Sequence, residues 1–243
     1  MEAITIAIIA AVFVVAVLYS SVGHGGASGY LAVMAFLAVA PGVTRPTALI
    51  LNVLVSTIAL IQFSRRGHFS WRLFWPFAVA SIPLAYIGGR IDLPTDVYKA
   101  VLGVVLLLTA IRLSLNIKTD GETKPPNLAA ALALGAAIGL VSGLVGVGGG
   151  IFLTPVLLLM RWSEARVAAG VSALFILVNS AAGLAGAYEK AIQLPAYVLP
   201  WLAAAVVGGL IGSTLGAKKF DTLTLRRVLA MVLVVAGLKL IFV

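Results

Sequence analysis

The chain has 243 residues, of which 62% are hydrophobic and 10% are charged, and its mean hydropathy is +1.14. Soluble domains carry roughly a quarter charged residues, so this composition indicates a polytopic membrane protein without room for a separate soluble catalytic domain. The net charge of +9 does not indicate nucleic-acid binding, because the Lys and Arg residues lie in short loops between apolar runs. The absence of cysteine excludes disulfides, thiolate metal sites and Cys catalysis.

Ten apolar segments follow one another along the chain, and most approach the roughly 20 residues that cross a bilayer core. The first lacks the basic start of a cleavable signal peptide, so we expect it to be retained as a membrane segment. The second and seventh are too short for an ordinary span and are interpreted as short spans or as halves of re-entrant hairpins. The segments are residues 3–22, 28–40, 45–63, 73–89, 97–115, 128–145, 151–160, 165–187, 195–216 and 223–242.

Two glycine-rich breaks precede these two short segments. The later one, within residues 142–155, has five glycines between Gly143 and Gly150, and each costs about 1 kcal/mol relative to Ala in a helix. Because the flanks are apolar, we expect the break inside the bilayer or at its edge. Irregular backbone survives there only when protein buries it or it lines a watery cavity. Residues 20–29 repeat the pattern when Gly23 is aligned with Gly146, an offset of 123.

The repeat extends beyond the glycines, because Asn52 and Asn179 match at an offset of 127. Each half reads as a long segment, a glycine break, a short segment and three further spans. The predicted organisation is a first transmembrane repeat at 1–115, a cytoplasmic linker at 116–127 and a second transmembrane repeat at 128–243.

The distribution of basic residues favours inverted halves. If each broken unit returns to the side from which it entered, 12 of the 17 Lys and Arg residues fall on one side; if it crosses once, they split 8 to 9. The positive-inside tendency favours the first arrangement, with both termini outside the cell membrane. The five basic residues on the opposite side would be Arg45, Arg90, Lys99, Lys190 and Lys239.

The pattern G-x-G-G-G-x-x-x-x-P from Gly146 to Pro155, the pair Asn179-Ser180, and the weaker first copy with Asn52 resemble the TauE/SafE sulfite exporter family across essentially the whole chain. The resemblance implies a membrane carrier of sulfite, sulfonates or related organic anions. The first copy differs by Ala27 in place of the last glycine and by His24 where the second has Val147. The fold class expected is an all-α integral membrane protein of two inverted repeats, with about five segments each and glycine-broken helices meeting near the midplane.

A helix that starts after such a break presents unpaired N–H groups and the positive end of its dipole, so two facing starts would form an anion cradle. Gly and Ala can also serve only for close helix packing. Asn52 and Asn179 either line the site or bond between helices. The predicted substrate-binding residues are Gly23, His24, Gly25, Gly26, Ser28, Asn52, Ser56, Gly146, Gly148, Gly149, Gly150, Thr154, Asn179 and Ser180.

His24 is the one ionisable residue expected in the apolar interior, where it either couples transport to protons or is a neutral hydrogen-bonded side chain. Arg45, by contrast, lies at a helix start and is expected to be an interfacial anchor, as are Glu164 and Arg166.

The sequence thus predicts a secondary transporter that exports a small sulfur-containing oxyanion by alternating access and is not an enzyme. No catalytic residue, metal or cofactor is predicted. The expected partners are the anion and the lipid bilayer, and no nucleic acid is expected. The sequence leaves open whether the protein forms a homo-oligomer. The alternatives are a carrier for another small solute, an importer of a sulfur anion, and an intramembrane serine protease with Ser28 as nucleophile. The protease lacks a second intramembrane His to act as base.

Overall fold

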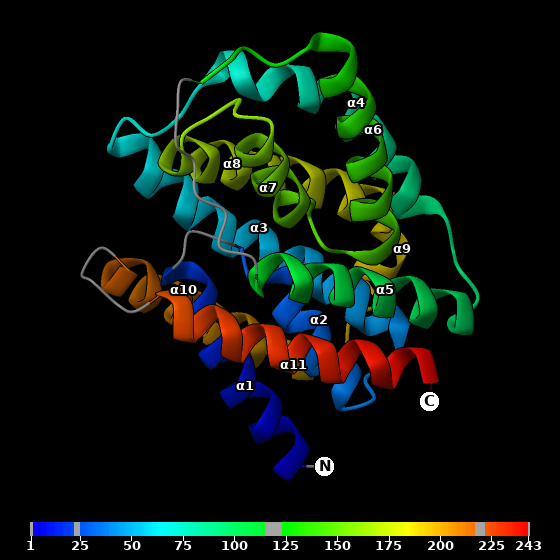
Figure 1. Cartoon of the computed structure of the whole chain (residues 1–243). Coiled ribbons are helices and arrows are strands. Elements are labelled where there is room, and N and C mark those ends of the chain that lie inside the picture. Colours follow the sequence, from blue (N-terminus) through cyan, green and yellow to red (C-terminus); the bar gives the residue numbers. More distant parts are fainter. Residues whose placement is uncertain (1, 22–24, 115–122, 217–221, 243) are drawn as a thin grey trace.

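The computed structural model describes residues 2–21, 25–114, 123–216 and 222–242, and every regular element in these ranges is helical. Figure 1 shows α3 and α8 in the middle of the molecule, α4 with α6 on one side, and α1, α10, α5 and α11 on the other. The elements are α1 (Glu2–Ser21), α2 (Ala27–Phe36), α3 (Pro41–Arg65), α4 (Trp71–Arg90), α5 (Thr95–Ser114), α6 (Leu128–Val145), α7 (Gly150–Leu159), α8 (Ala165–Gly186), α9 (Tyr188–Ala191), a 3-10 turn (Ala196–Val198), α10 (Leu199–Gly216) and α11 (Thr222–Phe242).

All ten predicted apolar segments coincide with helices, most of them within a few residues at each end. The short second and seventh segments are the ten-residue helices α2 and α7. Each begins at a left-handed glycine, and the second break starts where Gly146 ends α6 in the same conformation. Glycine adopts this conformation without the steric cost that other residues meet, which is why the breaks fall there.

The two halves repeat the same local structure. An offset of 123 carries both ends of α2 onto α7, and it also carries Ala38 (φ 55°) onto Arg161 (φ 56°), two positions with positive φ. The turns after the short helices match bond for bond: Val39 N–H donates to the carbonyl of Met34, and Trp162 N–H to that of Leu157. The duplication read from the sequence therefore reaches individual backbone hydrogen bonds.

The halves exchange their packing partners. The first helix of each half packs on the fourth span of the other half, as α1 on α10 and α6 on α4. Glycines allow the backbones to touch, because Gly135, Gly139 and Gly143 of α6 lie against the backbone of α4, and Gly208 and Gly212 of α10 against that of α1. These stripes run in register, so both pairs are parallel.

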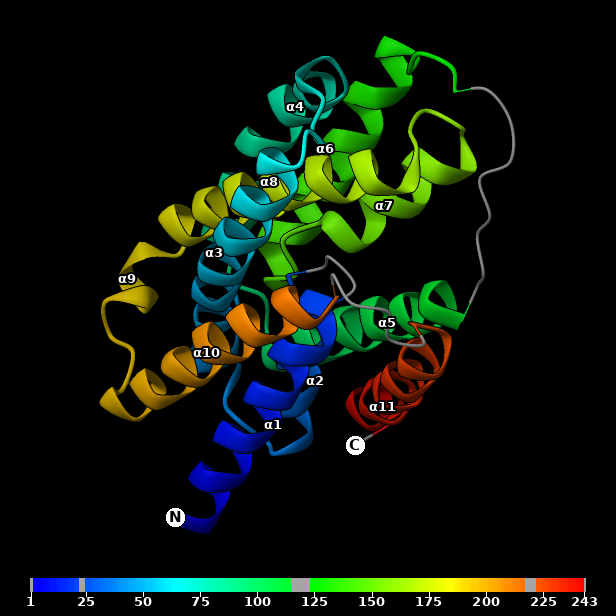
Figure 2. The same cartoon turned by 90° about the vertical axis from the view of Figure 1, so that its left-hand side faces the viewer.

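The equivalent helices α3 and α8 run in opposite directions. Gly183, near the end of α8, lies against Leu49 near the start of α3, whereas Gly170, near the start of α8, contacts His68 beyond the end of α3. Helices α5 and α11, which also correspond, are antiparallel too, because Gly103 meets Ile241 whereas the later Leu107 meets the earlier Gly237. Figure 2 shows the α5 and α11 pair side by side, below α3 and α8.

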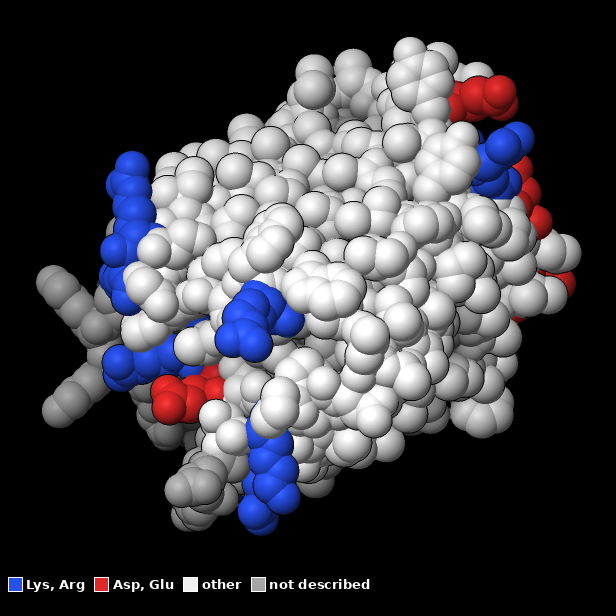
Figure 3. Space-filling view, turned by 90° about the horizontal axis from the view of Figure 1, so that it is seen from above, with Lys and Arg blue, Asp and Glu red and all other residues white. Residues whose placement is uncertain are grey.

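The outside of the molecule is apolar over a wide band. On α4, Trp75, Val79, Ile82 and Tyr86 repeat at helical spacing and all are exposed. Figure 3 shows a face without charged side chains over the middle of the molecule, with charged side chains mainly toward its left and right. Among the described helices, α3, α6 and α8 are long and apolar enough to cross a bilayer, and several shorter apolar helices accompany them. The fold is thus that of an all-α membrane protein.

Candidate functional site

Both glycine breaks lie inside the protein. Residues 25–32 and 145–150 are all buried, although the chain there is partly irregular. Gly26 (φ 86°) begins α2 and Gly149 (φ 79°) begins α7, and neither start has a side-chain cap. The first N–H groups of each helix consequently have no partner within the helix, and each start carries the positive end of the helix dipole.

Asn52 of α3 connects the two breaks. Its side-chain nitrogen donates to the carbonyl of Gly146 at 3.3 Å, at the end of α6. A Cβ added to Gly148 would lie 2.9 Å from Asn52 Nδ2, and a Cβ added to Gly25 would lie 3.7 Å from Asn52 Oδ1. The amide thus lies between the first and the second break.

Helix α8, which belongs to the second half of the chain, packs against both glycine breaks near Asn52. Ile176 is in contact with both breaks, at 3.3 Å from an added Cβ on Gly25 and 2.9 Å from one on Gly148. Ser180 Oγ would be 2.7 Å from the same Cβ on Gly148. Gly25, Asn52, Gly146, Gly148 and Ser180, all predicted from the sequence, are therefore brought together, and we call this set the glycine site.

The other predicted residues surround this core. Ser28 Oγ is 2.9 Å from Tyr19 Oη, which ties α2 to α1. Thr154 donates to the carbonyl of Gly150 at 3.0 Å and lies 2.8 Å from Ser172 Oγ, which ties α7 to α8. These hydroxyls have protein partners and hold the short helices in place.

The remaining glycines permit close contact. An added Cβ on Gly26 would lie 2.8 Å from the Tyr30 ring, one on Gly149 2.6 Å from Ser142 Oγ, and Gly150 lies against Ile176. Gly23 and His24 lie outside the described residues.

Seven buried polar side-chain atoms on α3, α6 and α8 have no hydrogen-bond partner among the described residues. Two of them belong to Arg45 and Thr47, and the other five belong to Asn and Ser side chains. All five side chains are fully buried. In such surroundings an unpaired polar group is costly, which points to a bound molecule or water as its partner. The five Asn and Ser atoms are Asn52 Oδ1, Ser56 Oγ, Ser142 Oγ, Asn179 Oδ1 and Ser180 Oγ.

Two residues of this region were not predicted. Ser142 precedes the second break, and its spacing of four residues from Gly146 placed it on the right helix face without marking it.

The expectation for Arg45 as an interfacial anchor is wrong, since its side chain is only 4% exposed. It donates to the carbonyls of Gly88, Gly89 and Ile91, at 2.6 Å and 2.9 Å for the first and last, and so caps the end of α4. Arg45 lies seven residues before Asn52, which is two helical turns and therefore the same face of α3. This spacing could have indicated from the sequence that Arg45 faces the interior.

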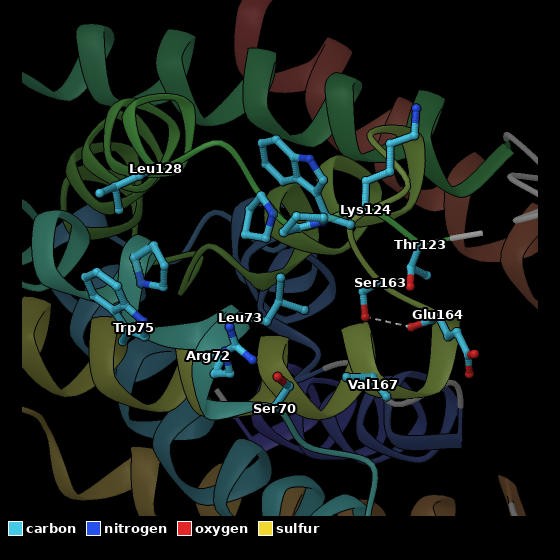
Figure 4. A pocket seen from close by; sticks show the side chains of 14 residues that line it. Ser70, Arg72, Leu73, Trp75, Thr123, Lys124, Leu128, Ser163, Glu164 and Val167 are labelled. Atoms are coloured by element: carbon cyan, nitrogen blue, oxygen red, sulfur yellow. Dashed lines mark hydrogen bonds between the residues drawn. The ribbon is translucent and has the colours of Figure 1, made fainter. Parts of the chain in front are cut away.

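A polar cavity lies away from the glycine site, at the starts of α4 and α8. Its volume is about 660 Å³, and Figure 4 shows Arg72, Lys124 and Glu164 around it, with Ser163 donating to the carbonyl of Glu164 at 3.1 Å. A second polar cavity of about 540 Å³ lies at the opposite ends of the same two helices, beside the Asp92–Lys190 ion pair.

The sequence model of the family described as sulfite exporter TauE/SafE matches residues 8–240. The chain belongs to the TauE/SafE sulfite exporter family. The family identifies it as a membrane transporter. It is 42% identical over 246 residues to the probable membrane transporter protein y4hK of Sinorhizobium fredii, covering 99% of both chains.

More distant relatives carry the same kind of name. The chain is 26% identical to the probable membrane transporter protein YjnA of Bacillus subtilis, covering 90% of this chain and 92% of the relative. It is 24% identical to YunE of the same organism, also named a probable membrane transporter protein, with 85% and 83% covered. No solved structure matches the chain. The names of these relatives support a transport function for this TauE/SafE family member, but they do not name a substrate.

Proposed function

We propose that this TauE/SafE family member is a secondary transporter that exports a small sulfur-containing oxyanion by alternating access. The observation that carries the proposal is the meeting of two uncapped helix starts, from α2 and α7, around Asn52 inside the protein. Such starts attract anions through free N–H groups and the helix dipole, without any Lys or Arg side chain.

The proposed arrangement in the membrane is two inverted repeats, 1–115 and 128–243, joined by a cytoplasmic linker at 116–127. The opposite directions of the equivalent helices α3 and α8 support inversion. The parallel pairing of α1 with α10 supports a broken unit that returns to the side of the membrane from which it entered. In that arrangement the chain enters α1 and leaves α2 at the same end of the molecule. On this arrangement the basic end faces the cytoplasm and both termini lie outside the cell membrane.

Export would be favoured by the membrane potential. With the interior negative, outward movement of one negative charge gains about 2.3 kcal/mol per 100 mV, so uniport suffices. Proton coupling through His24 stays a prediction. The two polar cavities, at opposite ends of α4 and α8, suit the roles of inner and outer approach to the glycine site.

The direct test is flux of radiolabelled sulfite from liposomes that contain the purified protein, with the membrane potential imposed by a potassium gradient. We expect efflux only with protein present, and faster efflux when the interior is negative. Protein-free liposomes are the control.

Three other outcomes would decide the alternatives. Flux of a small carboxylate without any flux of sulfite or sulfonates would establish a carrier for another solute. Uptake driven against the potential would establish an importer. Peptide cleavage that is lost in the Ser28→Ala variant would establish the protease.

A further inference from the structure

Asn52 of the glycine site and Asn179 of α8 each leave a hydrogen-bond acceptor, rather than a donor, unpaired among the described residues. The side-chain nitrogen of Asn52 donates to the carbonyl of Gly146 at 3.3 Å, and that of Asn179 donates to the carbonyl of Phe175 at 2.8 Å. Turning either amide around would set an oxygen against a carbonyl oxygen, so these contacts fix the orientation of both amides. Their oxygens, Asn52 Oδ1 and Asn179 Oδ1, are both buried and have no hydrogen-bond partner within the part of the chain that the structure describes.

The acceptor of Asn52 lies next to donors. Its Oδ1 faces Gly25, at 3.7 Å from an added Cβ, and Gly25 immediately precedes the glycine that begins α2. The first N–H groups of α2 are donors without intrahelical partners. The hydroxyls of Ser56 and Ser180 are also buried and have no partner among residues 2–21, 25–114, 123–216 and 222–242, and a hydroxyl can donate or accept. A ligand here would meet donors at the helix start and an acceptor at the amide.

This mixture distinguishes between classes of ligand. An oxyanion without any O–H or N–H group can only accept hydrogen bonds, so at the glycine site it would leave Asn52 Oδ1 buried and unpaired, with negative charge near it. A cation such as sodium would suit the amide oxygens but would meet the positive ends of α2 and α7. An anion that also carries a donor satisfies both kinds of group at once.

We propose that the glycine site selects oxyanions that carry a hydrogen-bond donor, hydrogen sulfite being the simplest, over oxyanions of the same charge that carry none. The negatively charged oxygens are held by the helix starts, and the donor is accepted by the amide oxygen of Asn52. The inference rests on the proposed function, because it takes the substrate to be an oxyanion.

The test compares two monoanions of similar size on the native protein in detergent. Hydrogen sulfite, used at a pH where this form dominates, carries a donor, and methanesulfonate does not. We expect calorimetry to give hydrogen sulfite an affinity at least about tenfold higher, since a buried acceptor left unpaired costs enough for that factor. Equal affinities would overturn the inference and leave the proposed function standing, whereas binding of neither anion would count against the proposed function itself.

A variant and a salt control complete the test. The Asn52→Ala variant, checked for folding by its melting temperature, should bind hydrogen sulfite more weakly and lose most of the preference over methanesulfonate. A preference that survives unchanged would exclude Asn52 as the acceptor and overturn the inference. Stabilisation of the native protein by sodium chloride but not by potassium chloride, without any oxyanion, would assign the amide oxygens to a cation and overturn the inference.

Discussion

Arg45 illustrates how much a single residue depends on its surroundings. Its guanidinium is buried against three backbone carbonyls at the end of α4, and no carboxylate among the described residues forms an ion pair with it. A charge in this position is held by backbone dipoles at a helix C-terminus, where cations are favoured. Its backbone also lies against Gly146, where an added Cβ would be 3.1 Å from the Arg45 carbonyl. Arg45 therefore joins the end of α4 to the second glycine break.

The Arg45→Met variant should be strongly destabilised. The substitution leaves the carbonyls of Gly88, Gly89 and Ile91 without their donor, for which we expect a loss of about 3 kcal/mol in the free energy of unfolding. Thermal melting in detergent measures the effect. The matched control is Arg90→Met, because Arg90 is exposed and lies in the last turn of α4, the helix end that Arg45 caps. Equal melting temperatures for the two variants would contradict a structural role for Arg45.

Single residues also show the limits of the sequence. Asn52 and Asn179 were predicted from their repeat and from the cost of an amide in an apolar helix, and Asn52 lies in the glycine site. Arg45 was not assigned to the site, because its burial depends on the end of α4, which is distant in the sequence. Ser142 was not assigned because its contact with Gly149 depends on how the chain folds back at the break. A charged residue near a helix start looks the same whether it faces headgroups or the end of another helix.

At the scale of elements, the sequence predicted the helices and breaks well. Long apolar runs and glycine clusters are local features, so helix α7 was expected at 151–160 and is found at Gly150–Leu159. The pairing of helices was not predicted. The glycine stripe of α6 indicates a close neighbour, but nothing in its spacing says that the neighbour is α4 of the other half.

At the scale of the whole molecule, the proposed orientation makes a labelling prediction for a chain without cysteine. Thr123 and Gln193 are both exposed and lie toward opposite ends of the bundle. A membrane-impermeant maleimide should label the Gln193→Cys variant in intact cells and the Thr123→Cys variant only after permeabilisation. The native chain is the blank. The reverse pattern would invert the topology, and labelling of both in intact cells would reject it.

The central claim is that one substrate site is built from the glycine breaks of both halves. The most direct measurement is calorimetric binding of sulfite to Gly26→Ala and Gly148→Ala, one variant from each half. An added methyl group meets the Tyr30 ring at 2.8 Å in the first and Ser180 Oγ at 2.7 Å in the second, and both positions have positive φ. Gly42→Ala is the control, because no atom lies within 4 Å of an added Cβ there.

We predict that both site variants, folded as judged by melting, bind sulfite at least about tenfold more weakly than the control, which corresponds to a loss of about 1.4 kcal/mol. Sulfite binding of native strength in the Gly148→Ala and Gly26→Ala variants would contradict the claim, and loss in only one of them would restrict the site to that half.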